Sequence, residues 1–158
     1  MLLGVGGVAA TGIGLSRSGP NQTFMLEGRG WHIYSRDIAR GRLPEGGERM
    51  LSYGELYAGE DAEKIGDFAA TYFGLPRGAA DGRLASLEQH VFTLPGGSLF
   101  GSGMTAPGFA TVDEFAIVGG TGKYAGARGT YVVRQSHLEF GGDGTATITF
   151  NLMKEASA

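Results

Sequence analysis

The sequence predicts an all-β protein, an eight-stranded antiparallel up-and-down β-barrel of lipocalin-like shape. Thirty of its 158 residues are glycine without a Gly-X-Y period, and 42% are hydrophobic, which argues against both collagen and disorder. The apolar residues form eight short runs rich in β-branched and aromatic residues, separated by turn residues. Such runs suit a barrel or a sandwich, and a barrel of this strand number encloses at most one small ligand.

Composition excludes several functional classes. The chain has 16 acidic and 13 basic residues, interspersed, for a net charge of −3, so nucleic acid is not an expected partner. Cysteine is absent, which removes disulfides, thiolate catalysis and cysteine-ligated metals. The uncharged segment 2–15 is too short for a membrane span.

The first residues differ from the rest, so we divide the chain into an N-terminal extension (1–22) and a barrel domain (23–158). Residues 2–15 are rich in glycine and alanine. They are interpreted either as the core of a truncated export signal, with a cleavage site near Ala9-Ala10, or as a simple extension. The first predicts an exported protein and the second a cytoplasmic one.

The first half of the barrel is expected to contain three strands. The first covers 23–38, with Phe24, Trp31, Ile33 and Tyr34, and a polar loop follows over 39–48. The second covers 50–58 and the third 65–75. Between them the acidic stretch at 60–64 could make one helical turn, and Gly66 argues against anything longer.

Five further strands complete the prediction. The fourth covers 84–94, and Pro95-Gly96-Gly97 turns it into the fifth at 98–105. The sixth covers 109–118 after Pro107-Gly108, and the seventh covers 129–139. The glycine-rich stretch 141–144 turns into the eighth at 145–153, where Ala146, Ile148, Phe150 and Leu152 share one face.

A glycine-rich corner at 115–129 joins the sixth and seventh strands. Glycines 119, 120 and 122 permit a tight turn, and Tyr124 is free to fold beneath it as an apolar plug. A phosphate-binding loop is the alternative, but it would need a Gly-Lys-Ser/Thr ending and a following helix, and neither is present.

The pattern Phe115-x-Ile-x-Gly-Gly-Thr-Gly-x-Tyr-x-x-Ala-Arg-Gly129 resembles the corner of the allene oxide cyclase and dirigent barrels. The segments at 54–59, 64–66 and 147–152 follow in the same order, so the resemblance covers roughly residues 29–153. It implies a cofactor-free barrel that binds a lipophilic small molecule. It also implies a homo-oligomer, a dimer or trimer, and relatives that close rings in secondary metabolism.

The first strand offers a candidate site. His32 and Tyr34 share one face, opposite Trp31 and Asp37. In a lumen, His32 and Tyr34 would supply a titratable base and a phenol donor. The alternative is a surface pair between subunits.

The resemblance adds roles to these positions. Allene oxide cyclases carry a glutamate and an asparagine where this chain has His32 and Tyr34, so true allene oxide cyclisation is not expected. Asp37 resembles the cavity aspartate of dirigent barrels, and Arg128 resembles the arginine after their corner. Asp37 and His32 both face the lumen only if a bulge intervenes. We predict His32, Tyr34 and Arg128 as catalytic residues.

The fourth strand places Glu88, His90 and Phe92 on one face. Neither of its faces is wholly apolar, which fits either a partner on the outside of the barrel or polar groups in the lumen. His32, His90 and His137 lack ligand-like spacing, so no metal is expected. The predicted substrate-binding residues are Asp37, Tyr72, Glu88, His90, Phe92 and Tyr131.

Three functions remain open. The first is a cyclase or isomerase-like barrel that folds a lipophilic substrate for intramolecular ring closure. The second is a dirigent-like or carrier barrel without turnover, and the third is a structural protein with a filled core. Two or more buried, hydrogen-bonded polar groups facing a cavity would favour catalysis, whereas an all-apolar lumen would favour carriage.

Overall fold

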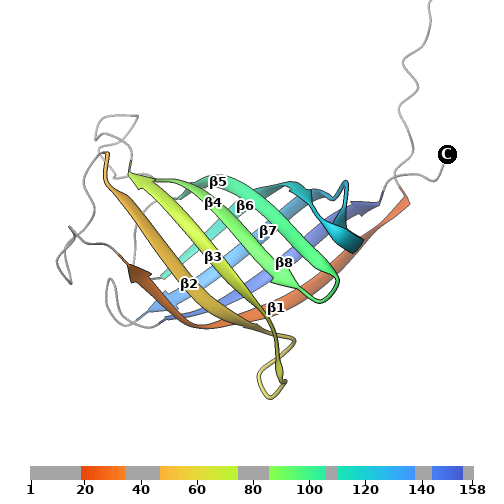
Figure 1. Ribbon diagram of the computed structural model, residues 1–158, viewed down its shortest axis with the longest axis horizontal. Helices are drawn as coiled ribbons and strands as arrows, with labels where there is room; N and C mark the ends of the chain where they lie inside the picture. The colour runs from red at the N-terminus through yellow and green to blue at the C-terminus, as the bar shows by residue number, and fades with distance from the viewer. Residues whose placement is uncertain (1–18, 35–46, 75–85, 106–109, 138–143, 155–158) are drawn as a thin grey trace, which may run out of the picture.

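Eight antiparallel strands close into one barrel in the computed structural model, which describes residues 19–34, 47–74, 86–105, 110–137 and 144–154 (Figure 1). Each strand pairs with the next, and the first pairs with the last. The predicted all-β barrel is confirmed. The strands are β1 (Gly19–Tyr34), β2 (Arg49–Tyr57), β3 (Lys64–Gly74), β4 (Ser86–Leu94), β5 (Gly97–Thr105), β6 (Ala110–Gly120), β7 (Arg128–His137) and β8 (Gly144–Lys154).

The strand bounds agree with the sequence prediction to one or two residues at most described ends. The largest difference is at the start of β1, which begins at Gly19 and pairs there with Lys154. The barrel therefore includes residues assigned to the N-terminal extension. The rest of that extension, residues 1–18, lies outside the described residues.

Between β2 and β3 the chain makes a turn instead of a helix. The Ala62 N–H donates to the Gly59 carbonyl at 3.2 Å, and no described residue there is helical. The turn between β4 and β5 is tight, as predicted. Gly96 has a φ of 89° there, a conformation that side chains with a Cβ rarely adopt.

The corner after β6 is a single 3-10 turn, η1 (Gly122–Tyr124). Gly122 has a φ of 57°, and a Cβ on Gly120 would lie 2.3 Å from the Tyr124 carbonyl oxygen. These two glycines are therefore required by geometry, whereas a Cβ on Gly119 would make only an ordinary contact with Arg128 Nη1, at 3.9 Å. Tyr124 packs against the core as expected. The Thr121 N–H donates to the Ser98 carbonyl of β5 at 2.8 Å, and the Ser98 N–H donates to the Thr121 hydroxyl oxygen at 3.1 Å.

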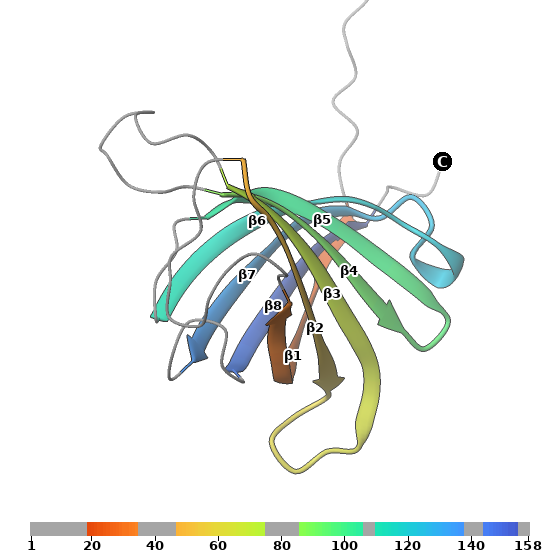
Figure 2. The same ribbon diagram turned by 60° about the vertical axis from the view of Figure 1, so that its left-hand side comes forward.

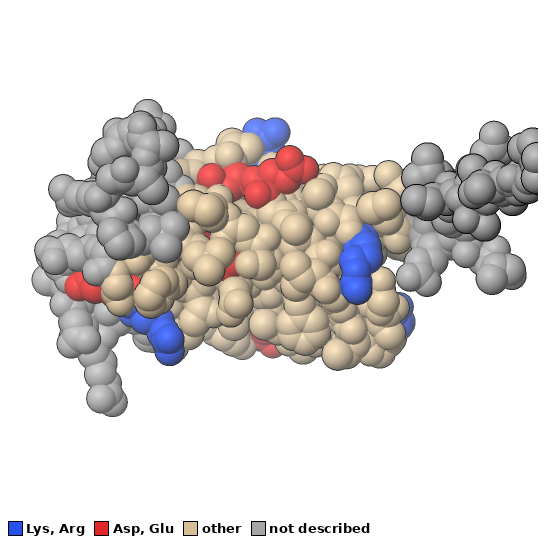
Figure 3. Space-filling view, turned by 90° about the horizontal axis from the view of Figure 1, so that it is seen from above, with Lys and Arg blue, Asp and Glu red and all other residues tan. Residues whose placement is uncertain are grey.

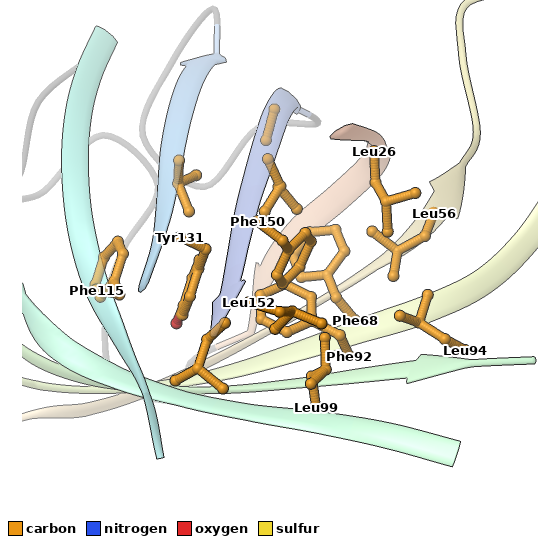
Figure 4. Close-up of a cluster of buried hydrophobic side chains, with 14 of the residues drawn as sticks. Leu26, Leu56, Phe68, Phe92, Leu94, Leu99, Phe115, Tyr131, Phe150 and Leu152 are labelled. Atoms are coloured by element: carbon orange, nitrogen blue, oxygen red, sulfur yellow. The ribbon is translucent and has the colours of Figure 1, made fainter. Parts of the chain in front are cut away.

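Alternation along each strand directs one face inward, and most of the buried apolar side chains form one large cluster (Figure 4). A second, small cluster contains Met50, Ala70 and Tyr72. The predicted inner face of β8 is confirmed. On β4 the inward face is the one that carries Glu88 and His90, while Leu87 on the other face is 42% exposed. Polar groups of β4 therefore lie in the lumen. The large cluster contains Leu26, Trp31, Leu56, Phe68, Phe92, Leu94, Leu99, Phe115, Ile117, Tyr131, Val133, Ala146, Ile148, Phe150 and Leu152.

The outer surface carries few charges on the face shown in Figure 3, where most of the described area is uncharged. At the start of β3, Lys64 pairs with Glu55 at 3.0 Å and with Asp67 at 2.7 Å. No helix in the described part of the chain has the length and apolarity to cross a lipid bilayer.

Candidate functional site

Polar side chains gather inside the barrel at the end where β1, β3, β5 and β7 finish. We call this the polar end of the lumen. It contrasts with the apolar end beneath the corner, where β8 finishes. Several of these polar residues are buried: Ser52 is 2% exposed, Glu88 3% and His90 7%. The polar end comprises Ser52, Tyr72, Ser86, Glu88, His90, Thr105, Asp113 and Gln135.

A chain of hydrogen bonds centres on His90. Residues two apart on a strand share a face, so Ser86, Glu88 and His90 are neighbours on β4. His90 Nε2 lies 3.0 Å from Glu88 Oε2, and His90 Nδ1 lies 2.7 Å from the Tyr131 hydroxyl of β7. The Ser86 hydroxyl donates to Glu88 Oε1 at 3.3 Å. Both ring nitrogens of His90 are therefore engaged by protein groups.

A second pair lies beside this chain on β3 and β2. Tyr72 is the direct register partner of Glu88, and side chains so placed are neighbours on the same face. The Tyr72 hydroxyl lies 2.9 Å from the Ser52 hydroxyl. The polar end thus places a phenol next to a carboxyl group.

Burial controls the protonation of these groups. It raises the pKa of Glu88, while hydrogen bonds from His90 and Ser86 lower it and the nearby Asp113 carboxylate raises it further. Burial likewise raises the pKa values of Tyr72 and Tyr131, and both phenols stay protonated near neutral pH. A carboxyl group with a raised pKa is suited to both accepting and releasing a proton.

A small cavity opens onto this cluster. Its volume is about 20 Å³, which is room for one water molecule. Its walls are aromatic and aliphatic apart from a few polar groups. The lining residues are Trp31, Phe68, Tyr72, Glu88, His90, Phe92, Phe115, Val133, Gln135, Ala146 and Ile148.

The structure brings five of the predicted site residues into the lumen. Tyr72, Glu88, His90 and Phe92 line the cavity. Tyr131 lies behind His90, and its ring fills the space left by Gly101, where a Cβ would stand 2.2 Å from the Tyr131 hydroxyl oxygen. These five residues come from β3, β4 and β7.

Arg128 does not face the lumen. Tyr131 and Val133 point inward on β7, so alternation turns Arg128 outward. Its side chain is exposed and donates to the carbonyls of Val118 and Ala127 at 3.2 and 2.8 Å. Arg128 therefore ties the corner to β6, and the prediction of a lumenal role for this arginine is corrected.

His32 and Tyr34 belong to β1 by their backbone. Their register partners are Tyr53 and Leu51, which are 47% and 53% exposed on the outside of β2. The side chains of His32 and Tyr34, and all of Asp37, lie outside the described residues. Their predicted roles stay predictions.

A β-bulge explains why the first strand was hard to interpret. The register of β1 shifts between Arg29 and Trp31, where Gly30 has a φ of 61°. Leu26 is buried before the bulge and Trp31 after it, so the inward positions change from even to odd numbers. The one glycine at position 30 was the only local signal of this change.

Sequence reasoning missed several residues of the site. Ser52 lies on the same face of β2 as the buried Met50 and Leu56, and this alternation of buried and exposed positions predicts that its side chain points inward. Asp113 shares a face of β6 with the buried Phe115 and Ile117. Gln135 likewise shares a face of β7 with the buried Tyr131 and Val133, so alternation could have found both residues. Within the described ranges, no three His, Asp or Glu side chains are grouped so that they could hold a metal ion.

No family model matches the sequence, and no curated protein matches it. Similar solved structures exist. The pterocarpan synthase dirigent protein PsPTS1 has a TM-score of 0.68 and 17% identity over 89% of this chain and 99% of its own. The Diels-Alderase AbmU from Streptomyces koyangensis has a TM-score of 0.63 and 15% identity over 86% and 64%. A pyocyanin demethylase has a TM-score of 0.55 and 18% identity over 80% and 98%. At these identities the likeness shows the fold alone.

Proposed function

We propose that this barrel binds one lipophilic small molecule at the polar end of its lumen and guides an intramolecular ring closure without a cofactor. The observation that carries the proposal is the buried, hydrogen-bonded set of Glu88, His90 and Tyr72 on an apolar-walled interior. Such an interior selects a folded conformer of a flexible guest, and the polar groups stabilise charge that develops as the ring closes.

The fold supports the proposal by analogy. A dirigent protein and a Diels-Alderase have a similar fold, so this scaffold can host such chemistry. The proposal does not extend to allene oxides, because His32 and Tyr34 replace the residues that the resemblance would require.

The size of the cavity limits how the guest sits. A cavity of about 20 Å³ holds one water molecule, whereas ligand pockets measure about 300–1,000 Å³. The guest therefore lies mainly at the mouth of the polar end, and only its reacting part reaches Glu88.

The alternative is a dirigent-like barrel that binds a small molecule without turning it over. The narrow cavity favours this second candidate, because a tightly filled lumen leaves little room for a substrate to change shape. Conversely, the hydrogen-bonded polar groups favour catalysis, since a carrier for apolar guests gains nothing by burying a carboxyl group.

One experiment separates the two. The protein is mixed with a neutral 1,7,9-decatrien-3-one, which closes its ring slowly in water, and binding is followed by the fluorescence of Trp31, the chain's single tryptophan. Ring closure faster than in buffer, with a changed stereoisomer ratio, supports the cyclase. Quenching of Trp31 without acceleration supports the carrier, and no quenching contradicts both.

Two variants control the location of binding. Ala146 lines the cavity on β8, so Ala146→Leu should fill it and weaken both quenching and turnover. Ala116 lies exposed on the outside of β6, so Ala116→Leu should leave both unchanged. Equal effects of the two substitutions would contradict a lumenal site.

We also infer that the chain forms a homo-oligomer, a dimer or trimer. Its support is an apolar row on the outside of the barrel. Phe73, Leu87 and Met104 are successive register partners on β3, β4 and β5, and they are 42%, 42% and 56% exposed. Light scattering should give a mass above that of one chain, and Leu87→Lys should reduce it to one.

A further inference from the structure

We infer that the polar end of the lumen is an acid–base centre that moves a proton at a carbon next to a carbonyl group, with Glu88 as the base and Tyr72 as the hydrogen-bond donor to the carbonyl oxygen. The inference rests on the proposed function, because it requires a guest at this end of the barrel. It adds the class of substrate and the chemical step.

Glu88, rather than His90, is the group that can reach the guest. Both ring nitrogens of His90 are occupied, one by Glu88 and one by Tyr131. Glu88 Oε1 and Oε2 each have one hydrogen-bonded partner in Ser86 and His90, and a carboxylate oxygen has two lone pairs. Glu88 also lines the cavity, so its free lone pairs are available to a guest.

Tyr72 is placed to act together with Glu88. The two are cross-strand partners on the inner faces of β3 and β4, so a donor and an acceptor face the same space. The Tyr72 hydroxyl also has the neighbouring Ser52 hydroxyl as a partner at 2.9 Å. A carbonyl oxygen at Tyr72 would place the adjacent carbon near Glu88.

His90 and Tyr131 are positioning residues. The Nε2 of His90 holds Glu88 in place, and the Tyr131 hydroxyl fixes the orientation of the ring through Nδ1. The titratable groups around Glu88 are Tyr72 on β3, His90 on β4, Asp113 on β6 and Tyr131 on β7. In the described residues, β1 and β5 turn no titratable side chain toward it.

The step balances without a further reactant. The Glu88 carboxylate removes a proton from the carbon next to the carbonyl, the C–H electron pair forms the enolate, and Tyr72 donates a hydrogen bond to the enolate oxygen. The Glu88 carboxyl then returns the proton to the same carbon or to the far end of the conjugated system. One C–H bond breaks and one forms, and nothing is oxidised or reduced.

The lining defines the substrate class. The walls near Glu88 are the aromatic rings of Trp31, Phe68 and Phe115, which suit an apolar, flat guest. Glu88 and Asp113 are both acidic, and no Lys or Arg of the described ranges lines the cavity. An anionic guest such as a fatty acid would be repelled, so the substrate is a neutral ketone or enone.

The test measures exchange of carbon-bound hydrogen for deuterium. The full chain is incubated with isophorone, a neutral enone, in D₂O, and NMR follows loss of the proton signals next to and conjugated with the carbonyl. Binding is measured separately by saturation transfer from protein to probe. Glu88→Gln should slow the catalysed exchange by about 10²-fold or more, since general bases contribute about 10²–10⁴-fold.

Tyr72→Phe is the second variant, because it removes only a hydroxyl group. It should slow exchange by about 10²-fold, as expected for a lost oxyanion donor. The matched controls are Glu114→Gln and Tyr53→Phe, both exposed on the outside of the barrel, and both should exchange at the wild-type rate. Circular dichroism verifies that each variant is folded.

His90→Asn tests positioning. Because the hydrogen bond from His90 lowers the pKa of Glu88, its loss should raise the pH at which exchange reaches half of its maximum. A merely structural role would reduce the amount of folded protein without moving this pH.

The outcomes separate the two proposals. Absence of saturation transfer to isophorone contradicts a lumen that binds a neutral lipophilic guest, and with it the acid–base centre. If saturation transfer is observed but the wild-type protein exchanges hydrogen no faster than the Glu88→Gln variant, the acid–base centre is contradicted and the binding proposal stands.

Discussion

The two ends of the lumen are built from the same eight strands and serve different purposes. At the apolar end the inner faces carry Phe24, Leu56, Leu99 and Phe150, and three of these four are completely buried. At the polar end the same strands carry hydrogen-bonded groups around Glu88 and a small cavity. The difference shows how one closed sheet separates apolar packing from buried polar groups along its axis.

Aromatic stacking fills the apolar end. The ring of Phe150 lies 4.8 Å from that of Phe24, 4.9 Å from Phe92 and 5.5 Å from Tyr131, measured between centroids. Figure 4 shows several of these side chains converging from different strands. Such packing contributes stability in proportion to the buried apolar area.

The largest effect is expected at the apolar end. Phe150→Ala should lower the free energy of unfolding by about 3–5 kcal/mol, because it removes a buried ring and leaves a cavity. Urea denaturation measures the change. Thr149→Ala, on the opposite face of β8, should change it by less than about 0.5 kcal/mol. A loss below about 1 kcal/mol for Phe150→Ala would show that the apolar end is not the main source of stability.

An intermediate effect is expected where the two ends meet. Gly101→Ala would place a Cβ 2.2 Å from the Tyr131 hydroxyl oxygen. The ring must move and lose its hydrogen bond to His90, so we expect a loss of about 1–3 kcal/mol in a urea titration.

Gly59→Ala is the matched control, since a Cβ there has no neighbour within 4 Å, and it should change stability by less than about 0.5 kcal/mol. Equal stability of the two alanine variants would contradict the close contact between Tyr131 and β5.

The smallest effect concerns pH and should appear only at the polar end. Because burial raises the pKa of Glu88, the folded state binds this proton more tightly than the unfolded state. The contribution of this proton to the free energy of unfolding is fully present below about 4.3, the pKa of glutamate in the unfolded state. It is lost as the pH rises through the pKa of Glu88 in the folded state. Glu88→Gln should remove this pH dependence from the free energy of unfolding. The change amounts to about 1.4 kcal/mol for each unit by which the pKa of Glu88 differs between the folded and unfolded states.

Phe150→Leu provides the comparison from the apolar end. It should lower stability equally at each pH, because no titratable group is involved. Urea titrations between pH 4 and pH 8 check both variants. A wild-type slope that persists in Glu88→Gln would mean that another group controls the pH dependence.

Much of the polar end followed from local pattern. Alternation on β4 placed Glu88, His90 and Phe92 on one face, and the structure puts that face in the lumen. The same reasoning was insufficient for β1, where the bulge at Gly30 changes the inward positions. The role of Arg128 was predicted from the resemblance alone. Tyr131 points inward on the same strand, so alternation directs Arg128 outward.

The sequence by itself determined an all-β chain of eight strands with polar residues on one face of the fourth, a pattern that suits a barrel or a sandwich. Turn residues and alternation are local properties, and each strand carries its own. Only the tertiary structure decided which groups meet. The contact between His90 and Tyr131 joins residues 41 positions apart, and it exists because the closed barrel brings β4 and β7 to face each other across the lumen (Figure 2).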